Sequence, residues 1–342
     1  MTLRVAVLGV GLMGTYHAET LANRTSGVAV TVINDFSPER AQEVAHSTGA
    51  RVVSDPLEAI AADDVDAVVI ATPGPAHEKQ VLACLETGKP VLCEKPLTTD
   101  AESSLAIVKA EAELGKQLIQ VGFMRRYDHE YAHLRGVVES GELGAPLLLH
   151  CAHRNKATHP HFDSEMVVKD ALVHEVDVTR FLFGEEITAV RILTPAPVST
   201  SHENLRDPQF AIFETESGRM VDVEVFVNTG IAYEVRTEAV FERGSVQIGL
   251  GMGAVHKTAP GVWGGPVTAD FRERFDQAYA SQLQAWADQS RKAIASGNYV
   301  VNGPRAWDGY AAAVVCEAGV RALNSGERVA IELPERASIP GA

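Results

Sequence analysis

Short apolar runs and longer amphipathic segments alternate along the first 122 residues. The segments between the apolar runs have helical character, and one of them begins with Ser37 as an N-cap followed by Pro38. Strands that alternate with helices of this length predict right-handed crossovers and a parallel, doubly wound sheet. We therefore predict an α/β domain over residues 1–122. Its strands, buried on both faces, are expected at 3–9, 28–35, 65–72, 89–95 and 116–123.

The pattern changes after residue 122. Alternation of apolar and polar residues predicts two antiparallel hairpins, one around Ser217-Gly218 and one around Arg243-Gly244. These hairpins and the helices around them predict a second domain, of the α+β class, over residues 123–342, with a large open and mainly antiparallel sheet. The other elements expected in it are helices at 127–140, 270–296 and 304–325, a strand at 146–154, and a loop rich in Gly and Pro at 251–268.

A mostly apolar helix is predicted over the stretch that begins DALVHEVD, and a thin line of polar residues runs along it. Asp170, His174 and Asp177 fall at positions i, i+4 and i+7, which places them on one narrow stripe. Glu175 and Thr179 point away from this stripe, and we expect them on the water-facing side. The stripe is either a reaction surface or a core histidine that is satisfied by two carboxylates.

The composition is that of an ordinary globular protein. The chain has 342 residues, of which 46% are hydrophobic and 22% charged, and its formal net charge is −15 at pH 7. A nucleic-acid partner is not expected, because it requires a concentrated basic face. No apolar run approaches a membrane span and no signal peptide is evident, so we expect a cytoplasmic protein. The spacing of the four cysteines and twelve histidines predicts neither disulfides nor a metal site.

The sequence GVGLMG occupies residues 9–14, directly after the first predicted strand. In this context Gly9 permits a tight turn, Gly11 lets the backbone approach a pyrophosphate, and Gly14 lets the helix pack closely on the strand. The N-terminus of the helix then faces the phosphate charge. The motif predicts a dinucleotide-binding site of the Rossmann type; the alternative is a glycine-rich turn in some other doubly wound protein.

Asp35 ends the second predicted strand, 21 residues after Gly14. A carboxylate at this place binds the ribose hydroxyls of the adenosine and repels a 2′-phosphate. NAD is therefore predicted as the cofactor in preference to NADP. Arg40 lies one helical turn further on and leaves some use of NADP open.

The sequence CEKPL, residues 93–97, follows another predicted parallel strand. Ligands of open α/β sheets bind at the carboxyl ends of such strands. Pro96 has no N–H and restrains Lys95 toward an extended conformation, and a cis peptide bond before Pro96 would direct Lys95 further. The sequence does not show the isomer. Lys95 is therefore a candidate catalytic residue, although an isolated lysine here would more often be a surface residue.

Together these motifs resemble the Gfo/Idh/MocA oxidoreductase family, and the resemblance spans essentially the whole chain. Two further motifs, GFMRRYD at 122–128 and HRN at 153–155, are similar to the inositol 2-dehydrogenase branch of that family. The resemblance implies NAD-dependent oxidation of a secondary alcohol of a cyclic polyol, with myo-inositol converted to 2-keto-myo-inositol (scyllo-inosose) as the expected reaction. The matching motifs are GxGxxG, ATPGPAH at 71–77, EKPL at 94–97 and Asp170-x-x-x-His174 with a further Asp at 177.

Alcohol oxidation makes three demands on such a site. A nicotinamide C4 must lie about 3–3.5 Å from the carbinol hydrogen, a base must take the hydroxyl proton, and a cation must stabilise the developing alkoxide. The resemblance assigns the last two tasks to Lys95, Asp170 and His174. His174 is our choice for the general acid/base, because an unperturbed imidazole titrates near neutral pH. Asp170 would orient that ring or hold a substrate hydroxyl, and Lys95 would bind the carbinol oxygen and Asp170.

The resemblance also implies which residues contact the cofactor and the substrate. His77 matches a position beside the nicotinamide and ribose, with a surface histidine at a helix start as an equal alternative. Tyr233 is expected to contact the substrate; the alternative is that it only packs in the antiparallel sheet. The expected cofactor contacts are Gly9, Gly11, Leu12, Met13, Gly14, Asp35, Thr72, Pro73, His77, Glu94 and Lys95. The expected substrate contacts are Arg125, His153, Asn155, Asp170, His174 and Tyr233.

Two other functions fit the same fold. One is an NAD(P)-dependent dehydrogenase of another inositol isomer or of an aldose sugar, and the other is a non-catalytic NAD(P)-binding sensor. A sensor has no need of Lys95, Asp170 and His174 together, which favours an enzyme. The open face of the second domain's sheet needs to be covered, so we predict a homo-oligomer, a dimer or a tetramer, that associates through this sheet.

Overall fold

The chain forms two compact units, and neither is continuous in sequence. The sequence predicts a single domain boundary after residue 122. It does not reveal that the chain returns to the first unit further on. Unit 1 contains Met1–Met124, Gln277–Val314 and the described residues from Leu333 onward, and unit 2 contains Arg125–Asp276 and Val315–Glu332. The computed structural model describes residues 1–199, 201–251, 256–259, 261–263, 268–334, 336 and 339.

Unit 1 contains a six-stranded sheet in which every pairing of neighbouring strands is parallel. The strand order β3-β2-β1-β4-β5-β6 changes direction between β1 and β4, so the sheet is doubly wound as predicted. Strands β4, β5 and β6 are buried along their length, in keeping with their mostly apolar sequences. The strands are β1 (Leu3–Leu8), β2 (Val28–Asn34), β3 (Arg51–Val52), β4 (Ala67–Ile70), β5 (Val91–Cys93) and β6 (Ile119–Val121).

Helices connect these strands and begin at local sequence signals. The side chains of Ser37, Asp55 and Asp100 accept hydrogen bonds from backbone N–H groups in the first turns of α2, α3 and α5. Pro follows the cap in α2 and α3, where its missing N–H has no consequence. The helices are α1 (Leu12–Arg24), α2 (Pro38–Thr48), α3 (Pro56–Ala61), α4 (His77–Thr87), preceded by a 3-10 turn η1 (Gly74–Ala76), and α5 (Ala101–Leu114).

The long helix α9 (Phe271–Ser296) explains why unit 1 is discontinuous. It begins in unit 2 and has non-helical backbone angles at Phe275, and the rest of it belongs to unit 1. Leu283 and Trp286 on this helix pack in the same apolar core as Leu3 of β1. The apolar face of a helix must be buried against another element. The core of unit 1 provides that surface, so this part of α9 folds with the parallel sheet.

Unit 2 contains a seven-stranded sheet with the order β12-β11-β7-β10-β9-β8-β15. Its pairings are antiparallel except for that of β7 with β10, so the sheet is mainly antiparallel as predicted. The two predicted hairpins are present as β9–β10 and β11–β12. The strands are β7 (Pro146–Arg154), β8 (Ile187–Leu193), β9 (Gln209–Thr215), β10 (Met220–Phe226), β11 (Glu234–Phe241), β12 (Gly244–Ile248) and β15 (Val329–Ala330).

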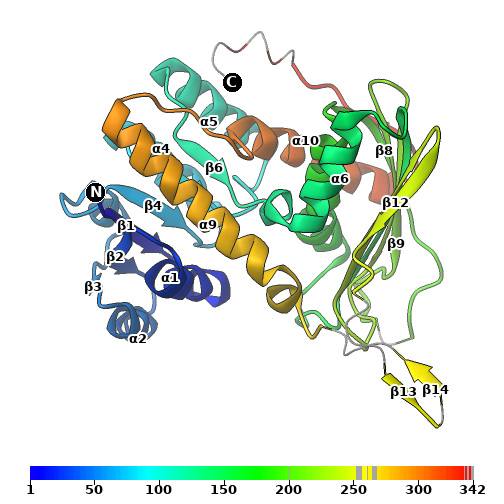
Figure 1. Ribbon diagram of the computed structural model, residues 1–342, viewed down its shortest axis with the longest axis horizontal. Helices are drawn as coiled ribbons and strands as arrows, with labels where there is room; N and C mark the ends of the chain where they lie inside the picture. The colour runs from blue at the N-terminus through cyan, green and yellow to red at the C-terminus, as the bar shows by residue number, and fades with distance from the viewer. Residues whose placement is uncertain are drawn as a thin grey trace. The chain divides into compact units, whose positions relative to one another are not determined.

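Helices of unit 2 lie on one face of this sheet (Figure 1). Buried residues alternate with half-exposed ones along β9 and β11, because successive side chains of a strand point to opposite faces. The helical segments are a 3-10 turn η2 (Met124–Tyr127), whose last three residues belong to unit 2, α6 (His129–Ser140), α7 (Ser164–Met166), a π-helical turn η3 (Val167–Leu172), α8 (Val173–Phe183) and α10 (Ala306–Ser325), which ends in unit 2.

Two sequence expectations need adjustment in unit 2. The regular helix expected from Asp170 is wrong at its first turn, because Asp170 lies in the π-helical turn and α8 begins at Val173. The loop expected at 251–268 contains a short antiparallel pair, β13 (His256–Thr258) with β14 (Gly261–Trp263). Much of the remainder of that loop lies outside the described residues.

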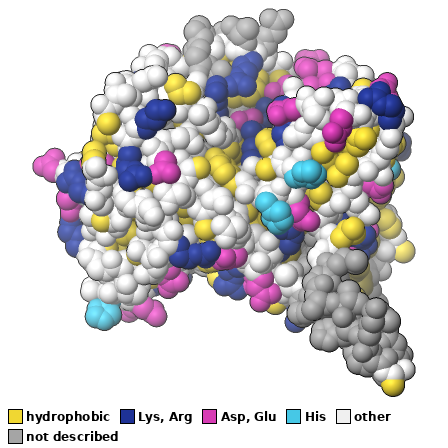
Figure 2. All heavy atoms as spheres, in the orientation of Figure 1, with side chains coloured by type: hydrophobic (Ala, Val, Ile, Leu, Met, Phe, Trp, Pro, Cys, Tyr) yellow, Lys and Arg dark blue, Asp and Glu magenta, His cyan; other side chains and the backbone are white. Residues whose placement is uncertain are grey.

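The described surface has mixed charge on the face shown in Figure 2, where positive and negative side chains intermingle. Among the described residues, no helix combines the length and the apolar character needed to cross a membrane. All four cysteines are buried, as small core residues.

Glu111 on α5 is a buried carboxyl group that supports the start of β6. Its Oε1 accepts hydrogen bonds from the backbone N–H groups of Leu118 and Ile119, both at 2.7 Å. Burial raises the pKa of Glu111 to about 7, although the two N–H donors oppose this shift. Its folded-state pKa therefore lies above the usual unfolded-state value of about 4.3.

We predict that Glu111→Gln changes how stability depends on pH. The contribution of Glu111 to wild-type stability is present in full below about pH 4 and is lost as the pH rises through about 7, because the folded state binds the proton more tightly. The glutamine does not ionise. The urea midpoint of the variant relative to wild type should therefore rise between about pH 5 and pH 8. Glu113→Gln, at an exposed position of α5, is the matched control and should follow wild type. Equal slopes for all three proteins would contradict the prediction.

Candidate active site

The turn between β1 and α1 is built from glycines, and two of them leave no room for a side chain. Gly9 has a φ of +77°, and a Cβ there would lie 2.7 Å from the carbonyl oxygen of Ala71. A Cβ on Gly14 would lie 1.7 Å from the carbonyl oxygen of Gly9, so helix and strand approach closely as predicted. A Cβ on Gly11 would meet no atom within 4 Å. Gly11 is the N-cap of α1, and the space beside it gives an anion access to the helix N-terminus.

Asp35 closes the same turn from the end of β2. Its Oδ2 accepts a hydrogen bond from Val10 N at 2.7 Å, and its Oδ1 accepts one from Ser37 N at 2.8 Å. Arg40 Nη2 lies 3.4 Å from Asp35 Oδ1. Each carboxylate oxygen still has a lone pair for a ribose hydroxyl, whereas a 2′-phosphate would meet the carboxylate charge. The open helix N-terminus and the carboxylate fit an NAD molecule. Leu12 is exposed and Met13 half-buried at the same helix start.

His77, expected beside the nicotinamide, is buried at the start of α4 and joins two loops. Its Nε2 lies 2.7 Å from the carbonyl oxygen of Thr72, and its Nδ1 lies 2.8 Å from that of Pro96. These carbonyl groups follow the neighbouring strands β4 and β5. The alternative of a surface histidine is wrong, because the side chain is buried within these loops. His77 therefore supports the loops on which Thr72 and the exposed Pro73 lie.

Lys95 is half-buried in the loop after β5, and the peptide bond between Lys95 and Pro96 is cis. The neighbouring Glu94 is buried. Its Oε1 lies 2.7 Å from His17 Nε2, and its Oε2 accepts a hydrogen bond from the backbone N–H of Lys95 at 3.2 Å. Glu94 thus fixes the backbone that bears Lys95, and His17 on α1 anchors Glu94. Sequence reasoning missed His17, whose only signal was a polar residue on a face of α1 that had to be buried.

In unit 2, Asp170 and His174 are accessible polar residues where the π-helical turn meets α8, and the exposed Lys169 precedes them. Asp170 is exposed and His174 is half-buried, whereas every other residue from Ala171 to Arg180 is buried. π-helical turns inside helices occur frequently at functional sites. A carboxylate and an imidazole, four residues apart, are therefore accessible on this segment of unit 2.

The expectation that Glu175 and Thr179 face water is wrong, since both side chains are buried. Glu175 pairs with Arg125, and Asp177 pairs with Arg126, whose Nη2 lies 2.6 Å from Asp177 Oδ1. Asp177 is therefore engaged in an ion pair and does not extend the accessible stripe. A buried carboxylate requires a cationic partner. The two consecutive arginines of η2 provide one for each carboxylate.

Arg125 and His153, both expected to contact substrate, belong to the same buried group. His153 Nδ1 lies 3.1 Å from Glu175 Oε2 and 3.3 Å from Arg125 Nη2. Burial alone would raise the pKa of Glu175, but Arg125 and His153 hold this pKa at about 2. Arg125 is 1% exposed and directs its guanidinium group at Glu175. The structure therefore gives Arg125 the task of neutralising Glu175, while its Nε is a buried donor without a hydrogen-bond partner among the described residues, so its contact with a substrate stays a prediction.

Asn155 and Tyr233 lie at the paired ends of β7 and β11. Asn155 Oδ1 is buried and has no hydrogen-bond partner in the described part of the chain. The Tyr233 ring meets the His153 ring edge-on at 5.8 Å, and burial raises the pKa of Tyr233 to about 12. The ring of His153 lies 6.2 Å from that of His174. Unit 2 thus brings Tyr233, His153 and His174 together, with Asn155 at the neighbouring strand end.

These groups define the chemistry available in each unit. Unit 1 presents a dinucleotide site and a lysine at the carboxyl ends of parallel strands. Unit 2 presents a carboxylate and an imidazole for proton transfer, together with amide and phenol groups that suit hydroxyl groups. Among the described residues, no group of three or more His, Cys, Asp or Glu side chains is placed to hold a metal ion.

Comparisons with known proteins agree with this combination. A family model described as an oxidoreductase family with an NAD-binding Rossmann fold matches residues 3–123, and one described as the GFO/IDH/MocA C-terminal domain matches residues 131–247. The chain is 63% identical to an inositol 2-dehydrogenase of Rhodococcus erythropolis, over 99% of this chain and 98% of the relative. It is 60% identical to an inositol 2-dehydrogenase of Mycolicibacterium smegmatis, over 99% of each chain.

A solved structure is similar over nearly the whole chain. It is a myo-inositol dehydrogenase from Lactobacillus casei in complex with NAD(H) and myo-inositol. The TM-score is 0.93 with 34% sequence identity, and the match covers 98% of both chains.

We predict that two alanine substitutions in the glycine turn separate folding from cofactor binding. In Gly14→Ala the new methyl group overlaps the Gly9 carbonyl, so the melting temperature should fall by about 5 °C or more. In Gly11→Ala the methyl group meets no atom, so the melting temperature should stay within about 1 °C of wild type. Calorimetry should show weaker NAD binding by Gly11→Ala, because its methyl group occupies the approach to the helix N-terminus. A stable Gly14→Ala protein would refute the close contact.

Proposed function

Because the chain belongs to the Gfo/Idh/MocA oxidoreductase family, we propose that it oxidises myo-inositol to 2-keto-myo-inositol with NAD as the hydride acceptor. The observation that supports this most directly is the likeness to inositol 2-dehydrogenases over the full length of the chain. The accessible pair Asp170 and His174 in unit 2 supports it independently, because this chain retains the groups that alcohol oxidation needs. A non-catalytic sensor would have no use for these groups together with Lys95.

His174 is the general base in this proposal. Its ring is half-buried while its helical neighbours are buried, so the ring is the accessible imidazole of α8. It takes the proton of the hydroxyl group that is oxidised, and Asp170, four residues before it, orients the ring or holds a second hydroxyl. Bound NAD supplies the hydride acceptor at nicotinamide C4.

Lys95 is the cation of the proposed mechanism. Its ammonium group stabilises the negative charge that develops on the carbinol oxygen. The backbone of Lys95 is held by Glu94, and the following Pro96 carbonyl is held by His77. These contacts restrict the loop before any ligand binds, which lowers the entropy that must be lost on reaching the reactive geometry.

Recognition of the polyol falls to polar groups of unit 2. Asn155 Oδ1 is a buried acceptor without a partner in the described residues, which is costly unless a ligand hydroxyl donates to it. Tyr233 is held neutral by burial and can donate its hydroxyl proton. A site of this kind rejects a stereoisomer whose hydroxyl groups leave such atoms unpaired.

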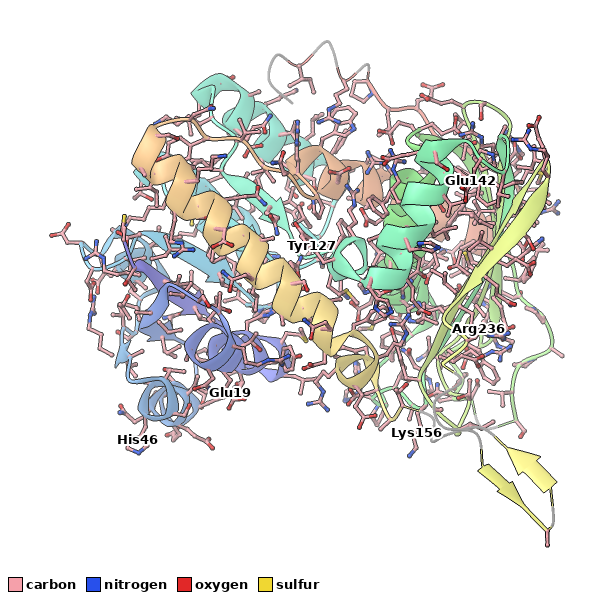
Figure 3. The ribbon with its side chains drawn as sticks, in the orientation of Figure 1. Glu19, His46, Tyr127, Glu142, Lys156 and Arg236 are labelled. Carbon is pink, nitrogen blue, oxygen red and sulfur yellow. The ribbon has the colours of Figure 1, made fainter. Side chains whose placement is uncertain are left out.

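We predict that the absorbance at 340 nm rises when the enzyme is mixed with NAD and myo-inositol at mildly alkaline pH, where release of a proton favours oxidation. His174→Ala should lower kcat by about 10²–10⁴-fold, as expected for loss of a general base. NAD binding, measured by calorimetry, should remain. The matched control is His46→Ala, because His46 projects from α2 into solvent (Figure 3) and should retain full activity.

The possible outcomes test the cofactor assignment and the substrate assignment separately. If the enzyme oxidises another inositol or an aldose but not myo-inositol, the proposed substrate is wrong and the proposed reaction type remains. NAD binding without turnover of any polyol would support the sensor. Full activity of His174→Ala would remove His174 from the mechanism.

The open face of the unit 2 sheet supports association with further copies of the chain. Met220, Leu148 and Val240 form an apolar row across β10, β7 and β11. The next row is Asp222, His150 and Glu238, so apolar and charged rows adjoin. A sheet face with both kinds of row can be self-complementary across a two-fold axis. We include in the proposal a dimer or tetramer that forms through this face.

A cavity of about 490 Å³ lies at one end of the same face. Arg154 lines it and pairs with Glu224 at 2.7 Å and Glu234 at 2.9 Å. Arg236 of β11, which Figure 3 labels, also lines the cavity. Tyr233, a proposed substrate-binding residue, is among the lining residues, whereas Asp170 and His174 are not.

We predict that Leu148→Glu lowers the oligomeric mass. A carboxylate placed in the apolar row would be desolvated in an interface without a partner, which costs several kcal/mol. Size-exclusion chromatography with light scattering should show a dimer or tetramer for wild type and a smaller species for the variant. Leu114→Glu, at an exposed position at the end of α5, is the control and should keep the wild-type mass. A monomeric wild type at micromolar concentration would show that this face has no such function.

A further inference from the structure

We propose that Glu175 is a positioning residue that keeps a proton on Nδ1 of His153, so that Nε2 of His153 accepts a hydrogen bond from a substrate hydroxyl group. The inference rests on the proposed function, in which His153 contacts the polyol. It assigns a task to a buried carboxylate that the proton and hydride transfers do not use.

The three side chains form a closed group inside unit 2. Glu175 Oε2 lies 3.1 Å from His153 Nδ1, and Glu175 Oε1 bonds Arg125 Nη1. Arg125 Nη2 lies 3.3 Å from the same His153 Nδ1. The side chains are 1–3% exposed, so water does not compete for these contacts. All the described hydrogen bonds of His153 are therefore made by Nδ1.

Nδ1 of His153 has one acceptor and one donor near it, and their charges decide its protonation. A proton on Nδ1 makes a charge-assisted hydrogen bond to the carboxylate of Glu175. A lone pair on Nδ1 would instead face a carboxylate oxygen 3.1 Å away, with no hydrogen between them. In a buried site that repulsion is strong. The arginine does not need Nδ1 as its acceptor, because it already donates to Glu175. The Nδ1–H tautomer is therefore favoured.

Arg125 is required for this arrangement because it keeps Glu175 ionised. Without a cation, burial would favour the protonated carboxyl group, which would then compete to donate to Nδ1. The guanidinium group also stacks over Phe275, with Cζ 5.5 Å from the ring centroid, which fixes its position. The ion pair thus sets the tautomer without itself reaching the surface.

The location of the His153 ring gives this tautomer a consequence for the substrate. The ring lies between two residues of the proposed site, 6.2 Å from the His174 ring and 5.8 Å from the Tyr233 ring. With Nδ1 protonated, Nε2 has a lone pair and accepts from an O–H group. Tyr233 donates and Nε2 accepts, so the two residues require different orientations of the hydroxyl groups they bind. Such a pattern discriminates between stereoisomers.

The same helix contains a matched control. Asp177 lies two residues after Glu175 on α8, is equally buried, and pairs with Arg126, the residue next to Arg125. None of its described hydrogen bonds reaches His153. Asp177→Asn therefore weakens a second buried ion pair on α8 and leaves the partners of His153 in place.

The first test is nitrogen NMR of ¹⁵N-histidine-labelled protein without substrate, with the His153 signals assigned by their loss in His153→Gln. Wild type and Asp177→Asn should show a protonated Nδ1 and an unprotonated Nε2. Glu175→Gln should lose this pattern and populate the other tautomer. If Glu175→Gln does not fold because Arg125 is left uncompensated, Arg125→Met/Glu175→Gln removes both charges and answers the same question. A wild-type His153 with its proton on Nε2 would overturn the proposal.

The second test uses myo-inositol and its mono-deoxy analogues. If Nε2 accepts from one hydroxyl, Glu175→Gln should raise KM for myo-inositol by about 10–100-fold, with a smaller change in kcat. With the wild-type enzyme, one deoxy analogue should show a KM raised by the same factor relative to myo-inositol. With Glu175→Gln, the KM of that analogue should be no higher than the KM of myo-inositol. Glu175→Asp should recover part of the affinity.

The readouts keep two failures apart. A lower melting temperature for Glu175→Gln with unchanged KM would make the residue purely structural and would overturn the proposal. The proposal would also be overturned if, for every deoxy analogue, the effect of the missing hydroxyl on KM simply added to the effect of Glu175→Gln. No turnover of any polyol by wild type would refute the proposed function and, with it, the substrate-binding part of this inference, while the NMR pattern would still decide the tautomer.

Discussion

Two carboxylates buried on α8 impose the constraint on which the arrangement of unit 2 depends. A buried carboxylate that loses its cation destabilises a protein by about 3–5 kcal/mol, so Glu175 and Asp177 must each have a partner. Arg125 and Arg126 are consecutive in the chain and fix α8 to η2 at two points. Glu175 and Asp177 are held inward by these pairs, whereas Asp170 and His174 are accessible polar residues of the same segment. The accessible chemistry thus follows from the buried electrostatics.

Unit 1 fixes its reactive loop by a different means, in which side chains bind backbone groups. Glu94 accepts from the backbone N–H of Lys95, and His77 bonds the carbonyl groups of Thr72 and Pro96. The anchor of Glu94 is His17, on the helix that begins at the glycine turn. The cofactor end of the sheet and the lysine loop are therefore one connected structure. In both units, buried side chains fix the structure around a candidate catalytic residue.

Much of the fold was predictable because hydrophobic periodicity reports burial directly. The parallel sheet was predicted from the alternation of buried strands with helices, and both hairpins from the alternation of residues around a short turn. The parallel pairing of β7 with β10 and the return of α9 to unit 1 depend on distant contacts and left no local signal. Glu175 was assigned to the wrong face because the pattern equates polarity with exposure. Its partner Arg125 lies 50 residues away, so no window of local sequence contains the pair.

Polar residues of the same type differ in their environment along the π-helical turn and α8, and burial is what separates them. Asp170 and His174 are accessible and suited to proton transfer, whereas Glu175 and Asp177 are neutralised and suited to holding position. His153 combines both conditions, because one ring nitrogen faces the ion pair and the ring lies beside His174. The buried charge of Glu175 can therefore select the tautomer of a buried histidine that lies beside the accessible His174. In the proposed site, substrate specificity then depends partly on Glu175, a carboxylate that the substrate does not touch.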